Sequence, residues 1–113
     1  MDCLFCTITS GTMGTEFLYE DDRAVAFRDI HPKAPVHLLV VPKQHVASIA
    51  DMEEQDSALI GHLSWIAKQL AEELEIADDG YRLIVNVRSH GGQEIDHLHL
   101  HLVGGQPLGP LVS

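Results

Sequence analysis

The sequence has few cysteines, few positive charges and no long apolar run, and each shortage narrows the class of protein. Two cysteines in 113 residues do not make the disulfide framework of a small secreted domain. Seven Lys and Arg face 17 Asp and Glu, so a formal charge of -10 disfavours binding to nucleic acid and anionic membranes. No run approaches the roughly 20 apolar residues of a membrane span, and no basic region leads into an apolar stretch at the N-terminus. We therefore expect a cytoplasmic protein without nucleic-acid or membrane partners.

Glycine and proline are also scarce, at nine and five residues, which excludes a collagen-like chain. With 45% hydrophobic residues the sequence is too apolar for a disordered one. A mass of 12.4 kDa suits one hydrophobic core, since two cores would each approach the size at which folding becomes marginal. Residues 1–113 are therefore expected to form a single domain with a single site.

The clearest predicted helix runs from Met52 to Glu75. Apolar residues recur there at spacings of three and four and form one stripe: Leu59, Leu63, Ile66, Leu70 and Leu74. Residues 51–54 resemble a capping box, although the first turn could equally lie before Gln55, and residues 78–80 supply the stop. Gly61 inside the helix costs about 1 kcal/mol relative to Ala and is typical of a close approach by a neighbouring backbone.

Short β-rich runs surround this helix, separated by turn-forming residues. They are residues 17–19, 24–28, 37–41, 81–87 and 97–103. The first two are predicted to pair as a hairpin, and a helical turn is expected at residues 2–9. Strands before and after one long helix, without strict alternation, favour an α+β fold built on an antiparallel sheet. The Gly- and Pro-containing tail, residues 104–113, is expected to lie across a partner or the rim of the site.

Three of the eight histidines fall in one motif, His97-Leu-His-Leu-His-Leu-Val103. In a strand the three imidazoles share one face, about 6.6 Å from one to the next, while the leucines enter the core. A helix would turn His99 away from the other two. Neutral imidazole can act as nucleophile, base, acid or metal ligand. The alternative is an exposed polar face without chemistry. For the isolated His62 and His90 we prefer a structural or solvated role.

This motif resembles the His-φ-His-φ-His-φ-φ signature of the histidine-triad (HIT) family. Further similar blocks occur in the family's order at residues 19–22, 26–32, 34–45, 80–86, 91–93 and 104–110. The sequence is most similar to the nucleotide-binding, phosphoramidase-type branch. The resemblance covers nearly the whole chain and implies one HIT domain over residues 1–113: an antiparallel five-stranded sheet, one long helix and a short N-terminal helix.

The resemblance implies a hydrolase that cleaves nucleoside 5'-phosphoramidates, of the AMP-NH2 or AMP-lysine type, to nucleoside monophosphate and amine. His99 would be the nucleophile that forms a nucleotidyl-histidine intermediate, which water then hydrolyses. His101 would contact the phosphate and His37 would complete the cluster, and either could supply a proton. No cofactor is needed for this chemistry.

By resemblance, further residues bind the purine nucleotide substrate. Asp29 would accept hydrogen bonds from the ribose hydroxyls, while Asn86 and the Gly92-Gln93 segment would hold the phosphate. Apolar residues would pack around the base: Leu4, Phe5, Ile8, Phe27 and Ile30. By pattern alone the same residues fit ordinary core or turn positions.

Two residues depart from the family pattern. Glu94 stands where many relatives have Ser or Thr, although bacterial-type relatives also carry Glu, so the group of the nucleotide site that touches the phosphate stays open. Asp96 stands where an apolar residue often precedes the triad. A carboxylate there repels an anionic substrate unless it turns away or pairs with a cation.

The Cys3-x-x-Cys6 pair predicts a metal or redox site. In a branch of the family such cysteines join a histidine of the Pro-Lys-x-His block and the first triad histidine, which are His45 and His97 here. The resemblance therefore implies a structural Zn²⁺ site that pins the N-terminal turn to the sheet. Two reduced thiols without a metal are the alternative.

Other functions remain open at this point. The triad itself could bind a catalytic zinc, as His-x-His pairs do, and chelators would then abolish activity. The chain could also be a dinucleoside polyphosphate hydrolase of the sister branch, or a non-catalytic nucleotide-binding interaction module. The resemblance also implies a homodimer.

Overall fold

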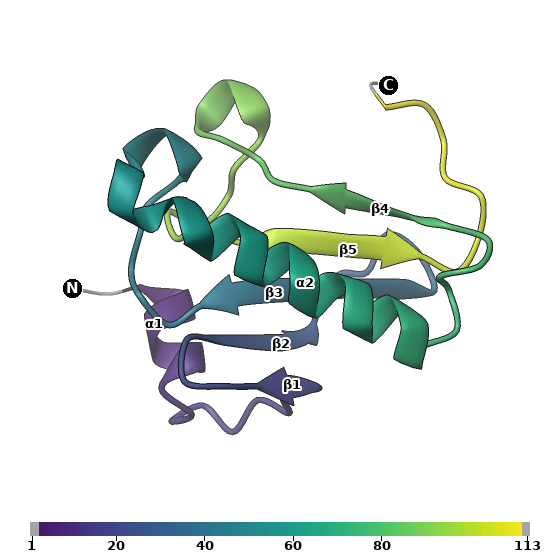
Figure 1. Cartoon of the computed structure of the whole chain (residues 1–113), viewed down its shortest axis with the longest axis horizontal. Coiled ribbons are helices and arrows are strands. Elements are labelled where there is room, and N and C mark those ends of the chain that lie inside the picture. The colour runs from purple at the N-terminus through teal and green to yellow at the C-terminus, as the bar shows by residue number, and fades with distance from the viewer. Residues whose placement is uncertain (1–2, 112–113) are drawn as a thin grey trace.

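The computed structural model describes residues 3–111, which form a five-stranded antiparallel sheet with helices on both faces (Figure 1). The spatial order of the strands is β1-β2-β3-β5-β4. Their bounds are Tyr19–Glu20 (β1), Ala24–Arg28 (β2), Val36–Pro42 (β3), Tyr81–Ile84 (β4) and Leu100–Gly104 (β5). The helices are α1 (Leu4–Thr9) and α2 (Ser57–Glu73). This architecture confirms the expected α+β fold, with one long helix and a short N-terminal one.

Alternation along the strands divides the buried side chains between two cores. Leu38 and Val40 of β3 pack with Leu63 and Ile66 of α2, whereas Leu39 of β3 belongs to the core beneath α1. A strand sends successive side chains to opposite faces, so a continuous apolar run such as β3 serves both. The α1 face also carries the cleft described below, because α1 covers only part of it.

The long helix begins later than its apolar periodicity predicts. Two short 3₁₀ turns, η1 (Ile49–Asp51) and η2 (Glu54–Asp56), precede it, and α2 starts at Ser57 instead of Met52. The capping box joins Glu53 and Asp56 instead of residues 51 and 54. The reason is that Met52 has extended backbone angles (φ -69°, ψ 149°), which break a continuous helix at that point.

The expectation for Gly61 was also wrong. No atom of residues 3–111 lies within 4 Å of the place where a Cβ would stand, outside the helix's own backbone and chain neighbours. Gly61 is exposed, so no close approach within this chain accounts for it.

The triad strand is shorter than expected, because β5 begins at Leu100 and not at His97. The backbone before Leu100 makes other hydrogen bonds. The N–H of Leu98 donates to the Val46 carbonyl at 2.7 Å, and the N–H of His97 donates to the Ile95 carbonyl at 2.8 Å. The leucines of the motif enter the α2 core as predicted. The imidazoles lie on the α1 side of the sheet, as predicted, since Phe5 of α1 packs against both His97 and His99. They differ in what they face: His97 points at the Cys3 thiol, whereas His99 and His101 line the cleft.

The C-terminal tail crosses the edge of the sheet face beside β4. The Arg82 guanidinium donates to the Gly109 carbonyl at 2.8 Å, and Leu108 and Gly109 border the cleft. The structure therefore places the described part of the tail on the rim of the site. Within residues 3–111, no helix has the length and apolar character required to cross a bilayer.

Candidate functional site

A cleft of about 820 Å³ opens on the α1 side of the sheet. It brings together most residues expected at the nucleotide site: Leu4, Phe5, Ile8, Phe27, Asp29, Ile30, His37, Asn86, Gly92, Glu94, His99 and His101. Three of the chain's seven basic residues, Arg28, Lys33 and Arg82, also line it. In a chain with a net charge of -10, this concentration of cations favours an anion in the cleft, although Asp29 and Glu94 also line it.

His99 is held with one particular ring nitrogen facing the cleft. Its Nδ1 lies 2.7 Å from the backbone carbonyl of His97, and a carbonyl can only accept, so Nδ1 carries the proton. The other nitrogen, Nε2, therefore keeps its lone pair. The edge of the Phe5 ring packs against the imidazole, with centroids 5.1 Å apart, and restrains its rotation. A neutral imidazole with a free, aimed nitrogen is a competent nucleophile.

His37 and His101 form a directed hydrogen-bond chain beside His99. The backbone N–H of Lys33 donates to His37 Nδ1 at 3.1 Å, which leaves the His37 proton on Nε2. His37 Nε2 lies 2.9 Å from His101 Nδ1, so the proton points at His101. His101 then carries its own proton on Nε2. Asp29 adds a carboxylate oxygen 3.4 Å from His37 Nε2.

Burial keeps this histidine pair neutral. Loss of water contact, with smaller contributions from the neighbouring His99 and His37, lowers the pKa of His101 to about 4. Burial also lowers the pKa of His37, although the Asp29 carboxylate acts in the opposite direction. An anion in the cleft would favour the protonated forms, because an opposite charge stabilises the imidazolium.

The loop that carries Gly92 is braced by the side chain of Gln93. Its amide nitrogen donates to the carbonyls of Ala47 (2.7 Å) and Ile95 (2.9 Å), and its oxygen accepts from the N–H of Arg88 (2.8 Å). Gln93 is not among the residues that line the cleft, unlike Gly92. Asn86 lines it, while its Nδ2 donates to the Gly91 carbonyl at 2.7 Å.

Two other residues singled out in the sequence lie on the rim of the cleft or outside it. Ile30 borders the cleft but is 86% exposed, so it forms part of the rim. Asp96 is exposed and does not line the cleft, which removes the conflict between its charge and an anionic ligand.

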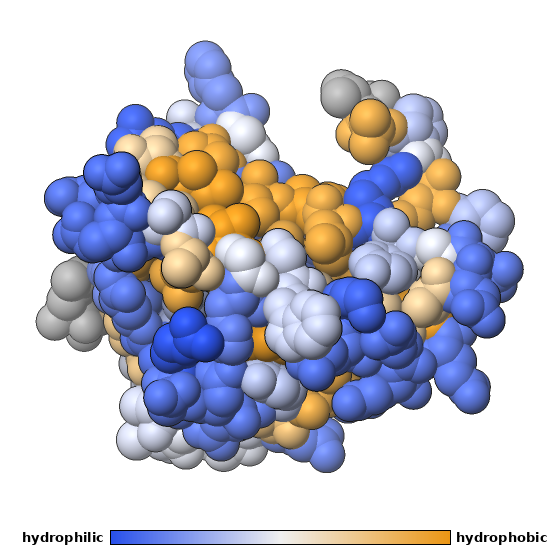
Figure 2. Space-filling model, in the orientation of Figure 1, coloured by the Kyte–Doolittle hydropathy of each residue, from blue (hydrophilic) through white to orange (hydrophobic). Residues whose placement is uncertain are grey.

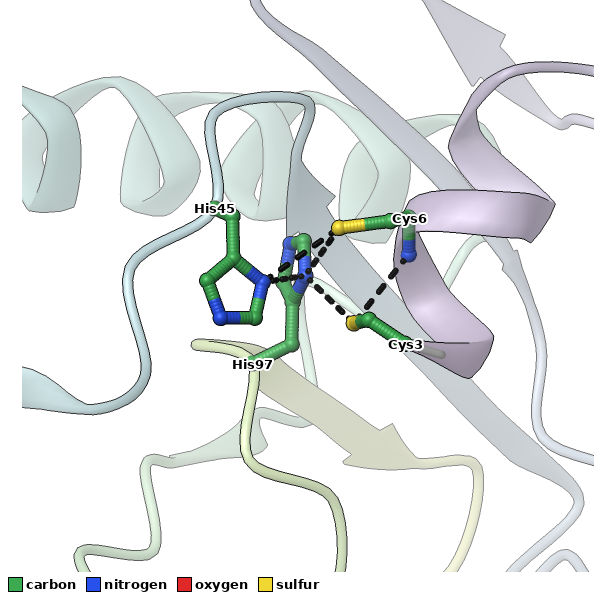
Figure 3. Close-up of side chains that lie close together, drawn as sticks. All are labelled: Cys3, Cys6, His45 and His97. Carbon is green, nitrogen blue, oxygen red and sulfur yellow. Dashed lines mark hydrogen bonds between the residues drawn. The ribbon is translucent and has the colours of Figure 1, made fainter. Parts of the chain in front are cut away.

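A second cluster joins Cys3, Cys6, His45 and His97, as Figure 3 shows. The cysteines come from the start of α1, His45 from the loop after β3, and His97 from the segment before β5. Their ligand atoms, the two Sγ and the two Nδ1, all lie within 4.8 Å of one another. The first pair lies 3.2 Å apart (Cys3 Sγ to His97 Nδ1), and the second 3.3 Å (Cys6 Sγ to His45 Nδ1).

The donor set and its orientation fit a metal ion. His97 Nε2 donates to the Pro42 carbonyl at 2.8 Å, so its Nδ1 keeps a lone pair directed at the cluster. His45 Nδ1 lies only 3.2 Å from His97 Nδ1, close to the roughly 3.3 Å between two nitrogens that bind one tetrahedral zinc at 2.0–2.1 Å. The four residues can therefore hold a metal.

Sequence reasoning missed the backbone N–H of Lys33 and the cations Arg28 and Arg82. A backbone donor leaves no side-chain signature in a sequence. The two arginines lie 54 positions apart and meet in one cleft only because β2 and β4 belong to the same sheet. The only available signal was the shortage of basic residues, which makes each one more informative.

Comparison with known proteins supports the class of protein that the sequence motifs resemble. The model of the HIT domain matches residues 11–108, and a relative from Escherichia coli K12, named purine nucleoside phosphoramidase, is 40% identical over 99% of this chain and 94% of its own length. A solved HIT family hydrolase from Legionella pneumophila Philadelphia 1 is 46% identical with a TM-score of 0.93, covering 96% of each chain. A histidine triad protein from Clostridium difficile is 41% identical with a TM-score of 0.94, covering 97% of this chain and 96% of its own.

The chain belongs to the HIT family. It is a hydrolase of that family, as the resemblance of its motifs implied.

Proposed function

We propose that this protein is a purine nucleoside phosphoramidase that works through a nucleotidyl-His99 intermediate, with residues 1–113 acting as one HIT domain. The carrying observation is the hydrogen bond from His99 Nδ1 to the His97 carbonyl, which leaves Nε2 free at the cleft. The name of the Escherichia coli relative supports the substrate class.

In the first step, His99 Nε2 attacks the α-phosphorus, and the bond from phosphorus to the amine nitrogen breaks. The His37–His101 pair takes up a proton when the anionic substrate binds, and His101 Nε2 is the proposed donor of this proton to the leaving amine, since its Nδ1 is already engaged by His37. In the second step, water attacks the phosphorus of the intermediate and His99 is released. The water gives its proton back to the His37–His101 pair, and the products are nucleoside monophosphate and amine.

The remaining lining residues would hold the nucleotide. Phe5 and Phe27, whose rings meet edge to face with centroids 5.9 Å apart, would pack against the base together with Leu4, Ile8 and Ile30. Asp29 would accept hydrogen bonds from the ribose hydroxyls, and Asn86, Gly92 and Glu94 would border the phosphate. The proposed part of Gln93 in this site is to shape the loop through its three backbone hydrogen bonds.

We also propose that the Cys3/Cys6/His45/His97 cluster holds a structural Zn²⁺. Zinc supplies a tetrahedral cross-link there, while two thiols and two imidazoles are its usual ligands. Burial lowers the pKa of His97, which favours the neutral form that a metal requires. A cytoplasmic location is consistent with this, because a reducing compartment keeps both thiols available.

A homodimer is the proposed assembly. β4 is an edge strand, and a two-fold pairing of identical edges would satisfy its free backbone groups. Figure 2 shows an apolar patch beside α2 and β4, and Trp65 of α2 and Leu83 of β4 are 54% and 40% exposed. Sedimentation of the purified protein tests this directly, and a monomer at micromolar concentration would refute it.

Turnover of adenosine 5'-phosphoramidate, measured with and without a chelator and beside a His99→Ala variant, tests the proposed function. Chelator-insensitive release of AMP that disappears in the variant supports histidine catalysis. Release of AMP that a chelator abolishes would instead indicate that the triad binds a catalytic metal. Binding without release would leave a nucleotide-binding module, and faster cleavage of a dinucleoside polyphosphate would favour the sister activity.

A further inference from the structure

The chain contains a second group with metal-binding chemistry, and it lies inside the proposed catalytic site. Asp29, His37 and His101 each offer one donor atom, and these atoms all lie within 4.8 Å of one another. Two imidazoles and one carboxylate form a common site for divalent transition metals. By residue type and distance alone, this group qualifies as a zinc site just as the Cys/His cluster does.

The two groups differ at one histidine each, His97 in the first and His37 in the second. The difference lies in what contacts the ring nitrogen that points away from the other donor atoms, called the distal nitrogen here. At His97 that nitrogen faces a carbonyl, which accepts its proton and leaves the metal-facing nitrogen bare. At His37 the distal nitrogen faces a donor, the N–H of Lys33 at 3.1 Å. A histidine that binds a metal normally donates from its other nitrogen, and only His97 is arranged to do so.

We infer that the backbone N–H of Lys33 sets the tautomer of His37 and thereby makes Asp29, His37 and His101 a proton-transfer group and not a metal site. A metal at His37 Nε2 would require a proton on Nδ1, and two N–H groups would then face each other across 3.1 Å. With the proton on Nε2 instead, His37 donates to His101 at 2.9 Å. One backbone donor thus orients the proton chain and protects it from metal.

The loop between β2 and β3 holds this donor in place. Lys33 lies between Pro32 and Pro35, two residues with restricted φ, and the loop closes where the Asp29 N–H donates to the His37 carbonyl at 3.0 Å. Pro32, Pro35 and His37 also border one small pocket of about 150 Å³, so the loop folds back beside the histidine. The Lys33 N–H is therefore positioned by rigid neighbours.

The wild-type protein allows a direct test that needs no substitution. Long-range ¹H–¹⁵N spectra of the zinc-loaded protein at neutral pH report which nitrogen of each imidazole is protonated. We expect His37 and His101 to be protonated on Nε2, and His99 on Nδ1. Excess Zn²⁺ should leave the His37 and His101 signals in place. A His37 protonated on Nδ1, or a second tightly bound zinc that shifts these signals, would overturn the inference.

A pair of variants at Lys33 separates the backbone donor from the side chain. Lys33→Pro removes the N–H, so His37 can adopt the other tautomer and offer Nε2 to a metal. We expect it to bind a second zinc at least about tenfold more tightly than wild type, the usual scale for a second-shell contact. Lys33→Ala keeps the N–H, and its His37 tautomer and zinc stoichiometry should match wild type. Matching behaviour of Pro and Ala variants, both folded by circular dichroism, would refute the inference.

The catalytic half of the inference rests on the proposed function, and the two can fail separately. If the enzyme turns over phosphoramidates, Lys33→Pro should lower kcat more than it raises KM, and micromolar Zn²⁺ should inhibit it further. If wild type shows no turnover, the proposed function fails, while the tautomer and zinc measurements still decide the role of the Lys33 N–H.

Discussion

His97 and His99 are two positions apart on one segment, yet the structure commits them to different chemistry. Each imidazole donates one hydrogen bond to a backbone carbonyl: His97 through Nε2 to Pro42, and His99 through Nδ1 to His97. The nitrogen left free is therefore Nδ1 in the first and Nε2 in the second. The first faces two thiols in a partly buried cluster, and the second faces the cleft. Which nitrogen the backbone occupies decides what a histidine can do.

The surroundings reinforce this division. The cluster that contains His97 is a closed set of four donors, as a structural metal requires. The cleft cluster is an open chain in which His37 Nε2 donates a hydrogen bond to His101 Nδ1. A closed donor set stabilises the fold, whereas an open chain can exchange protons with a ligand.

The largest expected effect comes from removing the free nitrogen of His99. His99→Ala should lower kcat/KM by at least about a thousandfold, since the proposed covalent intermediate forms on His99. Nucleotide binding, measured by calorimetry, should persist. The exposed His90→Ala serves as the matched histidine control, and turnover retained in the His99 variant would remove the nucleophile role.

Disrupting the closed cluster should affect stability more than catalysis. The double substitution Cys3→Ser and Cys6→Ser should remove the metal and cost about 3 kcal/mol of unfolding free energy, or a melting temperature lowered by roughly 10 °C. Scanning calorimetry and metal analysis check both. A chelator should lower the melting temperature of wild type to that of the variant and leave the variant unchanged. An unchanged melt and a metal-free native protein would contradict the zinc proposal.

Acid should weaken the cleft cluster through His101. Its pKa is lowered from 6.5 to about 4 on folding, so the unfolded chain binds more protons between these values. The unfolding free energy should therefore fall as pH decreases from about 6.5 to 4, by roughly 2 kcal/mol for this group after allowance for its partial exposure. Urea titrations of the double Cys→Ser protein with and without His101→Asn isolate the effect from metal loss. Parallel pH profiles for the two proteins would show that His101 is not the group responsible.

The smallest expected effect tests the connection between the two clusters. Gln93 links Ala47, two residues after the metal ligand His45, to the loop that carries Gly92. Gln93→Leu removes these hydrogen bonds and should cost about 1–2 kcal/mol of stability, with a severalfold loss of kcat/KM. Gln93→Glu keeps the acceptor for the Arg88 N–H but loses both donated bonds, so its stability and its kcat/KM should also be lower than those of wild type. Full activity in both variants would mean that the loop needs no such brace.

Periodicity and turn chemistry predicted the α+β fold, the long helix and the burial of the triad leucines, since these depend on local spacing. The start of the helix and of β5 could not be predicted, because both depend on which distant backbone groups compete for hydrogen bonds. At Leu98 that competitor is the Val46 carbonyl. The likeness to the HIT family identified the residues of both clusters.

The amino-acid sequence alone determined the class of chemistry: histidines, two thiols and few cations in a small acidic chain. Only the tertiary structure decided how that chemistry is divided, because a tautomer depends on the donor or acceptor that folding brings to each ring nitrogen. The Pro42 carbonyl at His97 and the Lys33 N–H at His37 are both backbone groups. Every non-proline residue carries such a donor and every residue such an acceptor, so their positions, and not their identities, separate the proposed metal cluster from the proposed catalytic one.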